Sequence, residues 1–109
     1  MEIDITGRHF AVGKALKDYV IEKAEKLAKY SLKLESAHIV LEVQKFRHIA
    51  EITLRGKNLR LAAKEESADM YAAFDKCLGV VQLQLGRQHD KVRDHKARRY
   101  EAQGSPKKV

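Results

Sequence analysis

Hydrophobic and polar residues alternate at a spacing of two in four separate stretches of the chain. The first covers residues 2–7, where Ile3 and Ile5 stand between polar neighbours. The other three have their apolar positions at Ala37, Ile39, Leu41 and Val43, at Ala50, Ile52 and Leu54, and at Leu59, Leu61 and Ala63. Such alternation is typical of a strand with one buried face. We therefore expect four strands, the last three joined as antiparallel hairpins by short polar links.

A helical period replaces this alternation in two other stretches. The first stretch runs from Lys14 to about Tyr30, with apolar residues at Leu16, Val20, Ala24 and Leu27. The second runs from Ala68 to about His95, with apolar residues at Met70, Phe74, Cys77, Val81 and Leu85. Ser67 is a suitable N-cap for the second helix, and the Asp69 carboxylate suits its first turn. Residues 81–85 also alternate as a strand would, but the longer pattern favours a helix.

The predicted element order is β-α-β-β-β-α, which makes the chain an α+β protein. Each helix has one apolar stripe and each strand one apolar face, so both helices should pack on one face of a four-stranded sheet. We expect one domain over residues 1–95 and a basic flexible tail over residues 96–109. The other sheet face mixes acidic and basic side chains and lacks the paired aromatic residues that stack on bases, so we do not expect a nucleic-acid platform there.

Charge changes this picture at two places. The 109 residues carry a formal net charge of +7, and residues 86–109 alone hold eight basic and three acidic side chains. On the first helix, Lys23 and Lys26 share a flank with Tyr19. If the helices pack side by side, this flank and the basic end of the second helix could line a groove that presents cations to the phosphates of a folded RNA. The same lysines also fit a solvated helix face, since Glu22 and Lys26 form a favourable i,i+4 pair.

Asp69-Met70-Tyr71-Ala72-Ala73 at the start of the second helix is the most specific of several motifs that identify a family resemblance. The others are Ile5-Thr6-Gly7, Ala15-Leu16, Lys23 through Leu27 to Tyr30, Val40-Leu41 with Val43, and Gln84-Leu85 with Asp90-Lys91. Through these motifs, residues 1 to about 95 resemble the ribosome hibernation promoting factor family, also called the ribosome-associated translation inhibitor or sigma-54 modulation family.

The resemblance implies a translation inhibitor that occupies the decoding channel of the small ribosomal subunit, contacts 16S ribosomal RNA and blocks messenger and transfer RNA in stationary phase or stress. It implies that the RNA contacts are made by Lys23, Lys26, Arg87, Lys91 and Arg93. It also implies a short member, without the extra domain of long members. Short members either cooperate with a separate ribosome modulation factor to form ribosome dimers or hold inactive monomers. The basic ending Ser-Pro-Lys-Lys-Val favours the first type.

Two departures from the family pattern leave a second function open. Val80 and Leu83 stand where members of the family usually carry Lys and Arg, and both lie off the apolar stripe. Each replaces an expected phosphate contact with an apolar side chain that faces outward. The alternative to the first function is therefore a protein-interaction module with weakened ribosome binding that uses the surface of Val80 and Leu83.

Catalytic, cofactor and membrane functions have no support in the sequence. No Gly-rich phosphate loop, Gly-x-Ser-x-Gly or His-Glu-x-x-His motif occurs, so we expect neither an enzyme nor a small-molecule substrate or cofactor. Cys77 falls on the apolar stripe, which predicts a buried thiol. His89 and His95 fall on opposite helix faces, which argues against a metal site. No apolar run reaches the roughly 18 residues that would span a membrane, and the amino terminus has no signal pattern, so we expect a cytoplasmic protein.

Overall fold

The protein has the predicted element order, in a computed structural model that describes residues 1–30 and 33–97, with side chains described through Gln88. The elements are β1 (Glu2–Arg8), α1 (Lys14–Glu25), the 3-10 helix η1 (Lys26–Tyr30), β2 (Leu34–Gln44), β3 (Arg47–Gly56), β4 (Leu59–Ser67) and α2 (Met70–Ala97). The α+β class and the order β-α-β-β-β-α are therefore confirmed. α2 extends two residues into the segment predicted as a tail, and residues 98–109 lie outside the described part of the chain.

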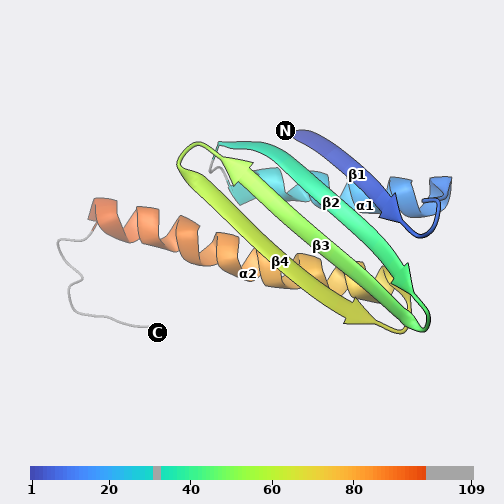
Figure 1. The fold of residues 1–109 in the computed structure, drawn as a ribbon. Helices are drawn as coiled ribbons and strands as arrows, with labels where there is room; N and C mark the ends of the chain where they lie inside the picture. Colours follow the sequence, from blue (N-terminus) through green and yellow to red (C-terminus); the bar gives the residue numbers. More distant parts are fainter. Residues whose placement is uncertain (31–32, 98–109) are drawn as a thin grey trace.

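The four strands form one mixed sheet in the order β1-β2-β3-β4. β1 pairs with β2 in parallel, and α1 makes the crossover that a parallel pair requires. β2, β3 and β4 are antiparallel neighbours joined by two-residue turns, as the short links predicted. Both helices lie on the same face of the sheet and run in the same direction (Figure 1). The β3–β4 turn lies at the end of the sheet near η1 (Figure 1).

The core lies between the helices and the inner face of the sheet. Ile39, Ile52 and Ala63 stand in register across β2, β3 and β4, and all three belong to the apolar layer beneath the helices. Phe74 from α2 is fully buried against this layer, as is Leu27 from η1. The apolar stripe of the first helix thus continues through the change to a 3-10 helix at Lys26.

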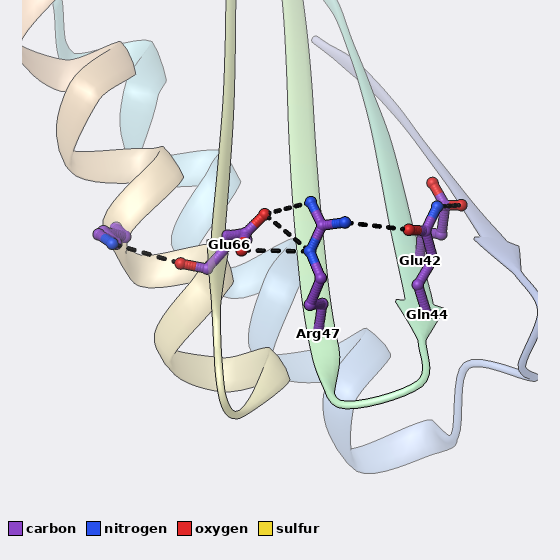
Figure 2. A network of polar contacts seen from close by, with 5 residues as sticks. Glu42, Gln44, Arg47 and Glu66 are labelled. Atoms are coloured by element: carbon purple, nitrogen blue, oxygen red, sulfur yellow. Dashed lines mark hydrogen bonds and ion pairs between the residues drawn. The ribbon is translucent and has the colours of Figure 1, made fainter.

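The open face of the sheet buries two apolar side chains without a covering helix. Val40 is 6% exposed and Ile49 is 5% exposed, although neither belongs to the layer beneath the helices. In register, Ile49 lies between Glu42 on β2 and Glu66 on β4. Arg47 beside it donates hydrogen bonds to Glu66 and to Gln44 (Figure 2). The polar network of Glu42, Gln44, Arg47 and Glu66 therefore shields Ile49 from water.

The amino-terminal cap of α2 differs from the prediction. Ser67 is the last residue of β4, and the helix starts at Met70, so Asp69 occupies the N-cap position. The Asp69 carboxylate accepts hydrogen bonds from the backbone N–H groups of Tyr71 at 3.2 Å and Ala72 at 3.3 Å. These are two of the donors that the first helical turn leaves without a partner. The Asp69-Met70-Tyr71 segment therefore has a structural role at the junction of strand and helix.

Candidate RNA-binding surface

Tyr19 fixes how the two helices lie against each other. Its ring packs edge-on against Tyr71 and Phe74 of α2, with centroid distances of 5.0 and 6.2 Å. Its hydroxyl donates a hydrogen bond to Asp75 Oδ1 at 2.6 Å. That hydrogen bond, supported by partial burial, raises the pKa of Tyr19 to about 12 because it stabilises the protonated phenol. The flank of α1 that carries Tyr19 therefore faces α2.

Lys23 lies on this flank, as the sequence predicted. Its Nζ is 5.4 Å from the centroid of the Tyr19 ring, within the range of a cation–π contact. Lys26 follows three residues later, at the start of η1, and is exposed. Neither lysine makes an ion pair with a residue in the described part of the chain. Both ammonium groups therefore remain available to an anion outside the protein.

Arg87 lies on the other flank of α2. Lys76, Val80, Leu83 and Arg87 follow at i, i+4, i+7 and i+11, which places them in one row along the helix. Lys76 Nζ, in this row, donates a hydrogen bond to the backbone oxygen of Glu66 in β4 at 3.2 Å. The row thus borders β4, whereas Tyr71, Phe74 and Asp75 face α1. The structure places Arg87, which is exposed, outside the groove predicted with Lys23 and Lys26.

The apolar pair that departs from the family pattern belongs to the same row. Leu83 is 57% exposed, as predicted for an outward side chain. Val80, by contrast, is half-buried, because this part of the row lies beside β4, where α2 packs; the prediction of an outward-facing side chain is therefore wrong for Val80. The pair therefore offers one exposed apolar side chain rather than the two that were predicted.

The two remaining predicted RNA contacts lie beyond Gln88, the last residue whose side chain is described. Lys91 and Arg93 lie within α2, but their side chains are outside the described set, as are those of His89 and His95. Four further cations, Lys33, Arg55, Lys57 and Arg60, are exposed near the β3–β4 turn. Arg55 and Arg60 belong to the open sheet face, which as a whole mixes charges of both signs and was not expected to bind nucleic acid, but at this end the basic residues gather together. The signal for them was present, since Arg55 and Arg60 flank a predicted turn with a lysine at its tip.

Cys77 is buried, as predicted. Its Sγ donates a hydrogen bond to the backbone oxygen of Ala63 at 3.3 Å. Burial raises the pKa of the thiol to about 12, because the thiolate would be poorly solvated there. Among the residues whose side chains are described, no group of three His, Cys, Asp or Glu side chains could hold a metal ion. None of the helices, over the described residues, is long and apolar enough to cross a membrane.

Comparison with known proteins finds relatives that match this chain over their whole length. The ribosome hibernation promoting factor of Salmonella typhimurium is 35% identical over 95 residues, which cover 87% of this chain and all of that protein. The factor of the same name from Escherichia coli is 33% identical over the same lengths.

Solved structures share the fold. The amino-terminal domain of Protein Y from Thermus thermophilus is 31% identical, with a TM-score of 0.74, over 80% of this chain and 98% of that one. A ribosomal subunit interface protein from Coxiella burnetii, 23% identical, has a TM-score of 0.76 over 81% of this chain and 97% of that one. The family model described as sigma 54 modulation protein / S30EA ribosomal protein matches residues 3–93. The chain therefore belongs to the sigma 54 modulation protein / S30EA ribosomal protein family.

Proposed function

We propose that the protein is a ribosome hibernation factor that binds the small ribosomal subunit and inhibits translation by occupying it. The observation that carries this proposal is the match to the whole length of the hibernation promoting factors of Salmonella typhimurium and Escherichia coli. The proposed site is the decoding channel, where the bound protein excludes messenger and transfer RNA sterically. Such a mechanism needs surface complementarity and affinity but no catalytic group, so the protein acts as a binding factor and not as an enzyme.

Affinity comes from cations that contact phosphates of 16S ribosomal RNA. Lys23 and Lys26 supply contacts on the α1 side, and Arg87, Lys91 and Arg93 supply contacts from α2. Support for Lys23 and Lys26 comes from their position on one flank without an ion pair to a described residue. Because Arg87 lies on the opposite flank of α2, it and the α1 lysines must reach different segments of RNA. The protein thus holds RNA at two sides of α2, by backbone charge rather than base sequence.

The test measures binding to purified small subunits over a series of salt concentrations. Log affinity should fall linearly with log salt, by about 0.7 to 0.9 for each neutralised phosphate. A Lys23→Gln/Lys26→Gln variant should lose up to two such contacts, which is roughly 25- to 60-fold in affinity at 0.1 M salt. Lys17→Gln is the matched control, because Lys17 is exposed on α1 but lies on a different flank from Tyr19. Failure of the wild-type protein to cosediment with small subunits at low salt would refute the proposal.

The second candidate function, a protein-interaction module with weakened ribosome binding, is favoured by the exposure of Leu83. At 57% exposed, Leu83 stands between Lys76 and Arg87 in the row beside β4. A Val80→Lys/Leu83→Arg variant discriminates the two functions. A large gain in affinity for the small subunit favours the interaction module, since ribosome binding was then impaired by the apolar pair. Little change favours the hibernation factor.

A further inference from the structure

We propose that Lys33, Arg55, Lys57 and Arg60 form a second phosphate-binding site at the β3–β4 turn, for the RNA backbone. The inference rests on the proposed function, because it takes the ligand to be the same ribosomal RNA. It adds a contact surface that the helices do not provide. The four residues lie at one end of the sheet, and the two arginines point away from the helix layer.

The sheet register brings the two arginines together. Arg55 on β3 and Arg60 on β4 are directly opposite each other. Their neighbours Leu54 and Leu61 pack into the core beneath the helices, so alternation turns both arginines to the open face, where they are exposed. Opposed side chains on antiparallel strands have Cβ atoms about 5 Å apart. Two guanidinium groups therefore share one small area of the surface.

The turn adds the two lysines to this area. Lys57 is in the two-residue turn between the strands, and its backbone N–H donates a hydrogen bond to the backbone oxygen of Lys33 at 3.3 Å. Lys33 directly precedes β2, so this bond ties a third segment of chain to the hairpin. Both lysines are exposed. The backbone thus holds four cations from three segments at one corner of the sheet.

These cations lack the anionic partners found elsewhere on the same face. Arg47 is paired with Glu66, and His38 with Asp4. In contrast, none of the four forms an ion pair or a side-chain hydrogen bond with a described residue. Glu35, the exposed acid next in sequence, is bonded to none of them. Like charges directly opposite on paired strands destabilise a sheet, so the cluster costs the free protein stability that an external anion would return.

Phosphate is the anion that this cluster fits best. Arginine presents a planar fork of N–H donors that matches the oxygens of a phosphate, and lysine adds a point charge. The cluster contains no aromatic or large apolar side chain, which a protein interface would place at its centre. The β3–β4 turn lies at the same end of the sheet as η1, where Lys26 begins the 3-10 helix (Figure 1). The RNA that contacts η1 could therefore also reach the β3–β4 turn, because both lie at the same end of the sheet.

The experiment compares the wild-type chain with an Arg55→Gln/Arg60→Gln variant in salt titrations of binding to purified small subunits. The variant should lower the magnitude of the slope of log affinity against log salt by about 1 to 2. At 0.1 M salt its affinity should fall roughly 5- to 60-fold. Lys64→Gln is the matched control, since Lys64 is exposed on the same face but stands in register with Glu51, and it should leave the slope unchanged. The thermal midpoint of the double variant should equal or exceed that of the wild type.

Two results would overturn the site. One is a double variant with wild-type affinity and slope, and the other is a loss of affinity with no change in slope, which indicates a contact other than phosphate. The same titration on protein-free 16S ribosomal RNA separates this inference from the proposed function. If the wild type binds that RNA but not the small subunit, the hibernation function fails. The difference between the wild type and the double variant in the slope of log affinity against log salt, measured on that RNA, then still decides whether the β3–β4 turn binds phosphate.

Discussion

Gly7 leaves no room for a side chain, so Gly7→Ala should destabilise the protein. A Cβ built on Gly7 would lie 2.6 Å from the backbone oxygen of Phe10 and 2.9 Å from Val12 Cγ2. Unstrained carbon–carbon contacts are about 3.5–4.0 Å, and carbon–oxygen contacts are about 3.3 Å or longer. The segment from Phe10 to Val12 would have to move by roughly 0.7 Å, although both side chains pack against the core. Gly7 does not have a positive φ, so space and not backbone freedom requires glycine there.

The expected loss is about 1–3 kcal/mol, which is typical of forcing an extra methyl group into a packed region. For a domain of this size, each kcal/mol lowers the thermal midpoint by about 4–8 °C. Thermal unfolding followed by circular dichroism, with urea unfolding as a second measurement, would determine the loss. Gly79→Ala is the control with the opposite sign, because nothing lies within 4 Å of its added Cβ in α2. It should stabilise the helix by about 1 kcal/mol.

A Gly7→Ala protein with the same thermal unfolding midpoint as the wild type would refute this reasoning. It would show that the connection after β1 does not press against the strand, or that it moves away at no cost. Loss of stability in both variants would point instead to a general intolerance of the fold to substitution. The informative result is therefore the difference in sign between the two alanine variants.

Two further outcomes follow from single side chains. The pKa of Tyr19 is raised from 10.0 to about 12, so its hydrogen bond to Asp75 contributes full stability below pH 10 and loses that contribution as the pH rises toward 12. The stability of the wild type should therefore fall more steeply over this range than that of Tyr19→Phe, as measured by urea unfolding at each pH; parallel curves would contradict the role of the bond. Cys77 is buried with its thiol pKa raised to about 12, so a thiol reagent should modify it only in step with unfolding or local opening. Rapid stoichiometric modification of the folded protein at neutral pH would contradict its burial.

The elements were predictable because their apolar periods are long and unambiguous. Residues 81–85 illustrate how the two periods compete. Val81 and Leu85 are fully buried while Leu83 is exposed, which is the helical result and not the strand-like alternation. The strand ends were less visible, since β3 begins at Arg47 and β4 ends at Ser67, where the regular apolar alternation has stopped. Hydrogen-bond pairing rather than hydrophobicity extends those strands.

The arrangement of the candidate site was predictable only in part. An apolar stripe shows which side of α2 is buried, but it does not show which of the two flanks beside the stripe faces α1. That choice depends on Tyr19 and Asp75, which are 56 residues apart in the chain. The cluster at the β3–β4 turn depends likewise on register, because Arg55 and Arg60 become neighbours only when the turn contains two residues. Side-chain contacts between distant segments were thus the missing information.

The polar network around Arg47 has a consequence for how the protein behaves at high concentration. A sheet covered on one face only could stack its bare face on a second sheet, as β-sandwiches do. Ile49 and Val40 would supply the apolar contact, but both are almost fully shielded. Stacking would first require breaking the bonds of Arg47 to Glu66 and Gln44 and removing these charges from water. The network therefore opposes self-association through this face.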